Sequence, residues 1–380
     1  MRVAAADRIK VLHVITGLNV GGAENALCKL MEHIDKEQFE NTVVSLLPEG
    51  PMAARVRDAG VPVYSVNLRK SLSAALAFFR LFSLIKKLKP NIVQTWMYHA
   101  DLIGGLTGKI IGIPVVWNIR HSNLDPSLNK KATLQVVKLC ARLSRMIPAK
   151  IVCCAQKALD VHAEAGYEKG KMLVIPNGFD TDIFHPDGES RAAVREELGI
   201  GDDTLLLGMA GRFDPQKDHR NFFDAARIVA SKNVDACFVL CGDGVDWENE
   251  PLVEMIDPAI RDRVYLLGRR VDMPRIYAAL DVFVLSSAGE AFPNVVGEAM
   301  ACGVPCVVTN VGDAALIVGD TGIVVPPGDS KVLASGILKL LGTHADERVK
   351  LGRLARERIR ENYDVRYMAR MYEDLYLGMC

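Results

Sequence analysis

Features typical of membrane, secreted and metal-binding proteins are missing from this sequence. No uninterrupted apolar run reaches about 18 residues, so no membrane-spanning helix is expected. At the N-terminus no charged segment precedes a sufficient apolar run, and we expect no signal peptide. The nine cysteines include no CxxC pair: Cys153 and Cys154 are adjacent, and the closest others are four residues apart. No zinc ligand set is visible, and we expect buried core thiols in a reducing cytoplasm.

The chain also lacks an excess of either charge overall, but not locally. It has 46 Lys and Arg residues against 46 Asp and Glu residues, which argues against a general nucleic-acid-binding protein. Between residues 59 and 159, however, fifteen Lys and Arg residues stand against only two acids, Asp101 and Asp125. This stretch is strongly basic although the whole chain is neutral.

Strand-like and helix-like segments alternate along the sequence, which predicts α/β domains with doubly wound parallel sheets. In the first half we expect apolar strands at 9–15, 42–46, 63–66, 92–95, 114–117 and 149–155, with helices at 23–34, 51–59, 71–88 and 127–146. In the second half we expect strands at 205–209, 237–241, 264–267, 281–285, 305–309 and 322–325. We also expect Asp272 and Asp329 to cap helices. A chain of 380 residues exceeds the usual size of one core, so two domains are expected.

Ligands on such sheets bind beyond the carboxyl ends of the strands, so the loops at those ends carry most weight. Two are expected in the first half, at 96–101 and 118–123, and the second contains Arg120 and His121. A lone histidine is more often a structural hydrogen-bond partner than a catalytic group. From the residues alone, His121 remains open to both interpretations.

The stretch from Ser286 to Gly303, SSAGEAFPNVVGEAMACG, crosses from a strand into a helix that we expect to begin near Pro293 or Asn294. The first N–H groups of a helix lack partners within it, and the peptide dipoles favour an anion there. Glu290 in the loop and Glu298 inside the helix cannot ligate a phosphate, but they can accept hydrogen bonds from ribose or sugar hydroxyls. The alternative is a solvated loop acid followed by an acid that merely suits the helix dipole.

Two further loops contain groups suited to phosphates. Residues 17–24 include GxxxGG, and glycines between a strand and a helix let the backbone approach a phosphate or sugar, although many only tighten a turn. After the strand at 205–209, Arg212 and Lys217 lie five residues apart. Such cations stabilise a leaving diphosphate, on which negative charge grows as the glycosidic bond breaks. For an arbitrary loop, two solvated surface charges are the simpler interpretation.

Four segments together resemble the retaining family 4 glycosyltransferases of the GT-B fold, or glycosyl transferases group 1. They are GLNVGGAE at 17–24, IPNGFDTDIFHP at 175–186, AGRFDPQKD at 210–218, and the Glu290 to Glu298 spacing followed by EAMACGVPCV. The resemblance extends over nearly the whole chain. It implies two facing Rossmann-like domains with an interdomain cleft: residues 1–178 on the acceptor side, 179–362 on the nucleotide-sugar side, and a helix at 363–380 that returns to the N-terminal domain.

The resemblance also implies roles for individual residues. Glu290 and His121 are expected to contact hydroxyls of the donor sugar, Arg212 and Lys217 to bind its diphosphate, and Glu298 to hold the ribose. The other expected donor-binding residues are Gly21, Gly22, Gly242, Arg270, Val271, Phe292, Pro293, Asn294 and Val295. Arg120 is a candidate for the acceptor side.

The implied reaction transfers a sugar from a nucleotide-diphosphate sugar, most commonly UDP-linked, to a glycan or lipid-linked glycan in surface polysaccharide or glycoconjugate synthesis. No cofactor and no metal are expected, because no DxD motif stands at a strand end. Retention follows from the family alone, and front-face attack and double displacement both stay open. Two alternatives are an epimerase-type GT-B enzyme and a silent nucleotide-sugar-binding module, which usually loses the equivalents of Glu290, Arg212 or Lys217.

The basic stretch suggests a peripheral contact with an anionic membrane. Residues 71–89 are strongly apolar and carry four cations and no acid, and residues 127–150 add six more cations. A basic, partly apolar surface suits an anionic leaflet, whereas solvated faces of core helices are the alternative. We predict that the N-terminal domain lies on the inner face of the membrane, where a lipid-linked acceptor would be presented.

Overall fold

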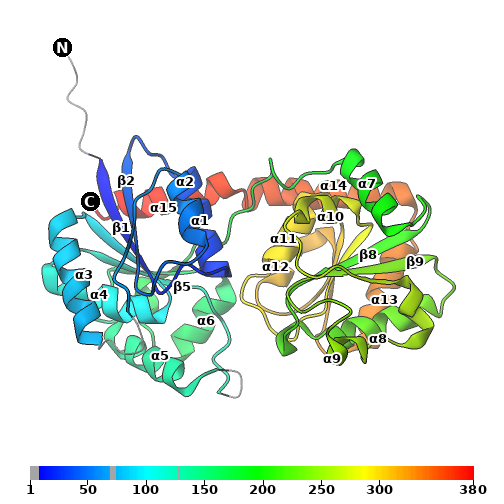
Figure 1. Cartoon of the computed structure of the whole chain (residues 1–380), viewed down its shortest axis with the longest axis horizontal. Helices are drawn as coiled ribbons and strands as arrows, with labels where there is room; N and C mark the ends of the chain where they lie inside the picture. Colours follow the sequence, from blue (N-terminus) through cyan, green and yellow to red (C-terminus); the bar gives the residue numbers. More distant parts are fainter. Residues whose placement is uncertain (1–7, 69–73, 127–128) are drawn as a thin grey trace, which may run out of the picture. The chain divides into compact units, whose positions relative to one another are not determined.

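The computed structural model describes residues 8–68, 74–126 and 129–380. The chain divides into two compact units, which are Met1–Gly178 with Val365–Cys380, and Phe179–Asp364 (Figure 1). The expected boundaries were 178 and 362. Each unit is a parallel sheet between two layers of helices, as the alternation of segments predicts.

Unit 1 is built on a seven-stranded parallel sheet in the order β3-β2-β1-β4-β5-β6-β7. Its strands are β1 (Ile9–Ile15), β2 (Phe39–Ser45), β3 (Val63–Ser65), β4 (Ile92–Trp96), β5 (Val115–Ile119), β6 (Lys150–Cys153) and β7 (Met172–Val174). Its helices are α1 (Gly22–His33), α2 (Met52–Asp58), α3 (Ala74–Leu88), α4 (Tyr98–Ile111), α5 (Lys131–Leu143), α6 (Gln156–Glu164) and α15 (Val365–Leu377). Residues 71–73 and 127–128, which we expected to be helical, lie outside the described part.

The last helix, α15, packs into unit 1, as the family resemblance implies, and its apolar spacing predicted that one side would be buried. Val365, Met368 and Tyr372 are buried in the same core as α1, α2 and β1, and Met371 and Leu375 are partly buried against it. Helix α15 lies beside α1 (Figure 1). Apolar residues three to four apart on a helix form one stripe, and here that stripe faces the sheet.

The expected loop at 96–101 is wrong, because α4 begins at Tyr98 and its first turn contains Asp101. The glycines further along α4 form the side of the helix that lies on the sheet. A Cβ on Gly104 would lie 3.0 Å from Thr95 Cγ2, and one on Gly105 would overlap Trp117 Nε1. Small side chains therefore allow α4 to pack closely on β4 and β5.

Unit 2 is built on a six-stranded parallel sheet in the order β10-β9-β8-β11-β12-β13. Its strands are β8 (Leu205–Ala210), β9 (Ala236–Cys241), β10 (Val264–Leu266), β11 (Val282–Leu285), β12 (Cys306–Thr309) and β13 (Ile323–Val325). Its helices are α7 (Gly188–Leu198), α8 (His219–Ala230), α9 (Glu250–Val253), α10 (Met273–Ala279), α11 (Asn294–Ala301), α12 (Ala314–Val318), α13 (Ser330–Leu341) and α14 (Ala345–Asn362). Helices α8 and α13 cover one face of the sheet, and α10, α11 and α14 lie on the other (Figure 1).

Of the two expected helix caps in this unit, one is confirmed and one is wrong. Asp329 accepts hydrogen bonds from the N–H groups of Lys331 and Val332, as a capping aspartate does. Asp272 stands at the start of α10 but makes no such cap bond. Its carboxylate is instead held by Arg270 and Arg275, at 2.7 and 2.9 Å.

All nine cysteines are free thiols; eight are buried and Cys380 is exposed. Over the part of the chain that the structure describes, no helix is both long and apolar enough to cross a bilayer.

Candidate active site

The second sheet reverses its strand order between β8 and β11, since β9 follows β8 on one side and β12 follows β11 on the other. Such a switch point leaves a crevice at the carboxyl ends of the strands, where α/β proteins bind ligands. The loop after β8 carries Arg212 and Lys217, and the loop after β11 carries Glu290. The topology thus brings the cationic loop and the acidic loop to the same edge of the sheet.

Lys217 and Glu290 meet at this edge. Lys217 Nζ donates to Glu290 Oε1 at 2.6 Å, and the two side chains are only 20% and 13% exposed. A close ion pair shielded from water is stronger than a surface pair, because less solvent screens it. Lys217 is therefore already positioned to bind a phosphate, and Glu290 beside it can accept a hydrogen bond from a ligand hydroxyl.

The loop after β11 is fastened to the short helix η2 (Pro215–Lys217) by Ser286 and by a backbone N–H group, while Ser287 holds Glu290; the sequence did not single out either serine. Ser286 Oγ donates to the Lys217 carbonyl at 2.9 Å, and Ala288 N donates to the Gln216 carbonyl at 2.8 Å. Ser287 Oγ donates to Glu290 Oε1 at 2.8 Å. These bonds fix the positions of Lys217 and Glu290 relative to each other. Nothing in the sequence distinguishes these serines from ordinary loop residues.

The loop after β12 supports Glu290 from the other side. Asp313 N donates to the Ala291 carbonyl at 2.9 Å, and Thr309 Oγ1 donates to the Ser287 carbonyl at 2.7 Å. Gly312 has a positive φ of 54°, and a Cβ there would overlap the Ala291 carbonyl. Glycine is therefore required where the two loops touch.

A pocket of about 230 Å³ opens beside this pair, within unit 2. Five of the expected site residues line it: Arg212, Gly242, Arg270, Val295 and Glu298. Lys217 and Glu290 are not in its lining. The backbone forms much of the wall, because Gly211 N donates to the Cys241 carbonyl and Gly242 N to the Gly268 carbonyl, both at 2.8 Å.

Glu298, on the first turns of α11, is oriented by a residue that we did not predict. Tyr277 on α10 is buried, and its hydroxyl donates to Glu298 Oε2 at 3.2 Å. Burial, and then the nearby Glu298, raise the pKa of Tyr277 well above its usual value, so the hydroxyl keeps its proton. A protonated tyrosine holds one carboxylate oxygen of Glu298 and leaves acceptor capacity for a ligand hydroxyl.

Of the three arginines that line the pocket, Arg270 and Arg212 differ in how firmly they are held. Arg270 is fixed by Asp272 and Glu197, and its hydrogen bonds to these carboxylates raise its pKa. Arg212 is 69% exposed and, among the residues that the structure describes, its ion pair is with the neighbouring Asp214, at 3.1 Å. Because an exposed arginine can change its rotamer at little cost, Arg212 can turn towards an anion. Val271 is 94% exposed and does not line the pocket.

The residues before α11 also do not line the pocket. Phe292 is buried, and its ring stacks on Phe179 with centroids 6.0 Å apart. Any contact with a donor would have to come from its backbone. Pro293 is the residue that precedes α11, and the helix begins at Asn294. Donor binding by these three residues stays a prediction.

In unit 1, the expected residues lie at the carboxyl edge of the first sheet. Gly21 precedes α1 in the loop after β1, Gly22 is the first residue of α1, and His121 follows β5. A Cβ on Gly22 would meet no atom within 4 Å, so its space is open. Arg120 donates to Asn177 Oδ1 and lies over the Trp96 ring at 5.5 Å, so its side chain is engaged within unit 1.

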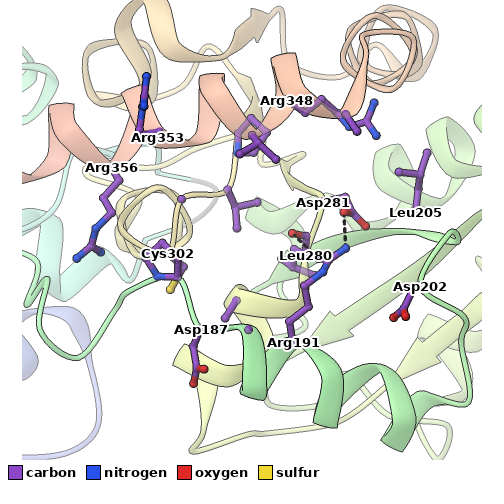
Figure 2. Close-up of a pocket in the computed structure, with 18 of the residues that line it drawn as sticks. Asp187, Arg191, Asp202, Leu205, Leu280, Asp281, Cys302, Arg348, Arg353 and Arg356 are labelled. Atoms are coloured by element: carbon purple, nitrogen blue, oxygen red, sulfur yellow. Dashed lines mark hydrogen bonds and ion pairs between the residues drawn. The ribbon is translucent and has the colours of Figure 1, made fainter.

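A larger cavity, of about 650 Å³, lies at the opposite, amino-terminal edge of the second sheet (Figure 2). Its lining includes Leu205, Asp281 and Pro305 at the starts of β8, β11 and β12, with arginines of α7 and α14. Arg348 and Arg356 bind backbone carbonyls there, and Figure 2 shows their side chains pointing in different directions. These cations do not converge on a common point.

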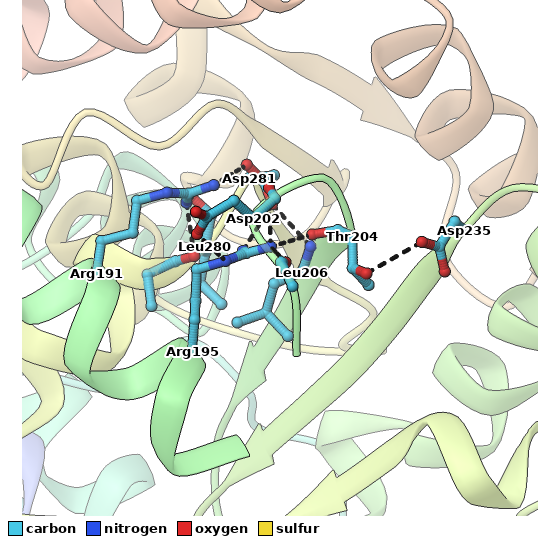
Figure 3. A network of polar contacts seen from close by, with 10 residues as sticks. Arg191, Arg195, Asp202, Thr204, Leu206, Asp235, Leu280 and Asp281 are labelled. Atoms are coloured by element: carbon cyan, nitrogen blue, oxygen red, sulfur yellow. Dashed lines mark hydrogen bonds and ion pairs between the residues drawn. The ribbon is translucent and has the colours of Figure 1, made fainter. Parts of the chain in front are cut away.

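Beside that cavity, charged groups are used to join elements (Figure 3). Asp281 pairs with Arg191 Nη2 at 2.8 Å and with Arg195 Nη1 at 3.5 Å, and it accepts Leu206 N at 2.7 Å. Arg195 is almost fully buried and also donates to the carbonyls of Gly201 and Thr204. The network therefore fastens α7 to the starts of β8 and β11, which is a structural task.

Family comparisons cover both halves of the chain. Residues 204–343 match the family described as glycosyl transferases group 1, and residues 20–183 match glycosyltransferase family 4. The first match contains all the residues that line the 230 Å³ pocket, and the second contains Gly21, Gly22 and His121. Among solved structures, HepE of Anabaena in complex with UDP has a TM-score of 0.84 and 22% identity, over 97% of this chain and 100% of that one. This likeness shows the GT-B fold.

Curated relatives include two bacterial enzymes whose names state lipid-linked sugars. The UDP-Gal:alpha-D-GlcNAc-diphosphoundecaprenol alpha-1,3-galactosyltransferase of Escherichia coli is 25% identical over 98% of each chain. The N,N'-diacetylbacillosaminyl-diphospho-undecaprenol alpha-1,3-N-acetylgalactosaminyltransferase of Campylobacter jejuni is 24% identical over 89% of this chain and 91% of its own. With both family matches and the GT-B fold, the chain belongs to the family 4, group 1 glycosyltransferases.

Proposed function

We propose that this glycosyltransferase moves a sugar from a UDP-linked donor to a lipid-diphosphate-linked glycan, with retention of the anomeric configuration, in surface polysaccharide or glycoconjugate synthesis. The observation that carries the proposal is the presence of two acids and two cations at the edge of the sheet where β8 and β11 end. Lys217 and Glu290 form a shielded pair, while Glu298 and Arg212 line the adjoining pocket. Diphosphate, sugar and ribose each have a suitable partner in this arrangement.

The expected chemistry breaks the bond between the anomeric carbon and the diphosphate oxygen. Negative charge then grows on the diphosphate, and Lys217 is already positioned to stabilise it, with Arg212 able to join. Glu290 would accept a hydrogen bond from a hydroxyl of the transferred sugar, and Glu298 would accept hydrogen bonds from the ribose hydroxyls. In front-face attack the acceptor oxygen forms the new bond to the anomeric carbon and its proton passes to the departing diphosphate oxygen. Front-face attack and double displacement both remain compatible with these residues.

The nature of donor and acceptor is supported by the relatives. The Escherichia coli enzyme is named for UDP-Gal, and both enzymes are named for sugars on diphosphoundecaprenol. A third relative, from Staphylococcus aureus, is named as a capsular polysaccharide biosynthesis glycosyltransferase. We therefore propose a lipid diphosphate as the anchor of the acceptor.

The division of labour between the two glutamates gives the sharpest test. Glu298→Ala should weaken binding of free UDP, because the ribose loses its acceptor. Glu290→Ala should leave UDP affinity almost unchanged and abolish transfer, because Glu290 is assigned to the sugar. Calorimetry with UDP and a transfer assay on the same variants measure both effects. Equal loss of UDP affinity in both variants would refute the assignment.

Two controls separate this function from its alternatives. Incubation with donor alone should release UDP slowly and give no isomerised sugar; an isomer would identify an epimerase. Nuclear magnetic resonance of the product's anomeric proton should show the donor's configuration, and inversion would exclude a retaining enzyme. We also propose that no metal is needed, since Lys217 and Arg212 can carry the charge, so a chelator should leave turnover unchanged.

A further inference from the structure

Helices α3, α4 and α5 lie side by side on one face of the first sheet, with α4 between the other two (Figure 1). Each presents one exposed side, because its exposed residues recur at helical spacing. We define the α3–α5 face by these exposed side chains: Leu76, Phe79, Arg80, Lys86 and Lys87 on α3, Leu106, Lys109 and Ile110 on α4, and Lys131, Lys138, Leu139, Arg142, Arg145 and Met146 on α5 and the turn after it.

The α3–α5 face contains no acidic side chain. The single acid on the three helices, Asp101, is fully buried. Within the described residues, only Arg145 of the face forms an ion pair, with Glu168 Oε2 at 3.7 Å. A helix face that is merely solvated usually mixes both charges and forms pairs three or four residues apart. Apart from Arg145, the cations of this face form no ion pair within the described residues.

The same face exposes large apolar side chains among its cations. Phe79, Ile110 and Met146 are 66%, 58% and 68% exposed. Single exposed apolar residues are ordinary, but a group of them on one face marks an interaction surface. This mixture of cations and apolar side chains favours an anionic membrane over a nucleic acid. A nucleic acid would contact the cations but leave Ile110 and Met146 without an apolar partner.

A hollow on this face can receive an anionic group. It has a volume of about 470 Å³ and is lined by Lys138, Arg142 and Arg145 together with Ala141, Ala165 and Gly166. Neither Lys138 nor Arg142 forms an ion pair within the described part of the chain. Three cations around a hollow of small residues suit a phosphate group that protrudes from a surface.

We propose that the α3–α5 face docks on an anionic lipid bilayer. Its apolar side chains enter the boundary between headgroups and acyl chains, its Lys and Arg residues contact lipid phosphates, and the hollow holds one headgroup. The biological sense of this contact rests on the proposed function, since an enzyme whose acceptor is anchored by a lipid diphosphate works at a bilayer surface. The contact is formed by unit 1 alone.

Co-sedimentation of the full chain with vesicles tests the proposal. At low salt the protein should sediment with vesicles of phosphatidylcholine and phosphatidylglycerol but not with phosphatidylcholine alone. Binding should weaken as salt rises, because the Debye length shortens to about 8 Å at physiological ionic strength. A protein that ignores the anionic vesicles at low salt overturns the proposal.

Paired variants locate the contact. Lys138→Glu with Arg142→Glu should weaken binding by at least about 25-fold, since each of the two cations near an anionic surface contributes about fivefold. Lys232→Glu with Lys350→Glu, the same charge change at exposed sites of unit 2, is the matched control and should change binding less than about twofold. Equal loss in both pairs would mean general charge attraction and overturn a specific face. Ile110→Ser with Met146→Ser should weaken binding about tenfold, also at raised salt, as lost apolar burial requires.

Further readouts keep these outcomes distinct. Circular dichroism melting should show that each variant folds. Duplex DNA offered at the same salt should bind much more weakly than anionic vesicles, and the reverse would point to a nucleic-acid partner and overturn the proposal. The charge variants should retain transfer to a soluble acceptor without a lipid tail and lose transfer to a vesicle-embedded one. If even the unaltered chain glycosylates neither acceptor, the proposed function fails while sedimentation still decides the docking.

Discussion

The two sheets have the same doubly wound architecture but distribute their polar side chains differently. In unit 2, strands β8, β9 and β11 are built almost entirely from apolar residues, and the polar groups gather at their ends. In unit 1, polar side chains stand inside the strands: His13 in β1, Gln94 in β4 and Asn118 in β5 are all buried. Buried polar groups cost stability unless they are hydrogen-bonded, so their partners explain their presence.

Most of those partners belong to the same network in unit 1, and two of them are on α15. Tyr376 OH donates to Gln94 Oε1 at 3.3 Å, and Asn118 Nδ2 donates to Tyr372 OH at 2.8 Å. Trp96 Nε1 donates to His13 Nδ1 at 3.3 Å, which leaves Nε2 of His13 to donate to Asn41 at 3.0 Å. Helix α15 is thus held on the sheet of unit 1 by hydrogen bonds to β4 and β5 as well as by apolar packing. The polar groups at the carboxyl ends of the unit 2 strands form the candidate site, whereas the polar groups inside the unit 1 strands join elements of the fold.

Asp101 provides the largest expected effect that can break this comparison. Asp101 joins α4 to the sheet, because its Oδ1 accepts hydrogen bonds from Thr95 Oγ1 at 2.6 Å and from Asn118 N at 3.4 Å. Burial raises its pKa from 3.8 to about 7, although these hydrogen bonds oppose the shift. Between those values the folded state holds a proton that the unfolded state releases. The contribution of Asp101 to the free energy of unfolding is therefore fully present below about pH 4. It is lost as pH rises through 7, and the loss is on the order of 4 kcal/mol.

Asp101→Asn should remove this pH dependence, because the amide oxygen can still accept both hydrogen bonds and carries no charge. Denaturant unfolding followed by tryptophan fluorescence measures it, since Trp96 and Trp117 are buried in unit 1 and Trp247 of unit 2 is exposed. The pKa values of His13 and His162 are lowered by burial to about 4, and their contribution is lost in acid. That background is common to both proteins and cancels in the difference. A variant with the parental pH profile would contradict the assignment.

Lys217→Ala tests the unit 2 side of the comparison. We expect kcat to fall about a hundredfold, or about 2.7 kcal/mol, as for the loss of one preorganised contact to a developing charge. Folding should be preserved, because Ser286 binds the backbone carbonyl of Lys217 and not its side chain. Steady-state kinetics with the donor measure the effect. An unchanged kcat would exclude Lys217 from stabilising the leaving diphosphate, and Lys232→Ala serves as a surface control.

Asn118→Ala should destabilise unit 1 by about 2 kcal/mol, because the buried Tyr372 hydroxyl loses its donor. A double-mutant cycle with Tyr372→Phe sharpens the test. If the hydrogen bond between β5 and α15 is the cause, the two changes together should cost less than the sum of their separate effects. Strict additivity, measured by the same tryptophan fluorescence, would mean that each side chain acts only through its packing.

The sequence predicted most elements of both sheets, because a buried parallel strand is a short apolar run with few alternatives. It failed at 96–101, where a loop was expected at the strand end but α4 begins at Tyr98, and the glycines of α4 allow this helix to pack closely on β4 and β5. The strand β7 was missed because it has only three residues, none of them fully buried, and so carries a weak pattern.

At the site, the sequence identified the charged residues but not the groups that hold them. Glu290 and Glu298 stood out because acids around a helix start need an explanation, whereas Arg212 was assigned through the family motif. Tyr277 resembled an ordinary core aromatic, and its hydrogen bond to Glu298 depends on α10 and α11 lying together. Asp272 was expected to cap α10 because its position is right for a cap, but two arginines offer it stronger, charge-assisted bonds.

Ser287 gives the smallest expected effect, and it tests whether unit 2's polar groups are arranged for chemistry more than for stability. Its hydroxyl donates to the Glu290 oxygen that also receives Lys217, so it limits the positions that Glu290 can adopt. Ser287→Ala should lower kcat about tenfold, or roughly 1.4 kcal/mol, the range of a hydrogen bond to a charged group. The melting temperature and the affinity for UDP should change little, because the Glu290 carboxylate keeps Lys217 and the backbone of the loop is unaltered. Ser287→Thr should restore most of the activity if the hydroxyl matters. If Ser287→Ala instead lowers stability and leaves kcat intact, Ser287 belongs with the structural network of the fold, as the buried polar groups of unit 1 do.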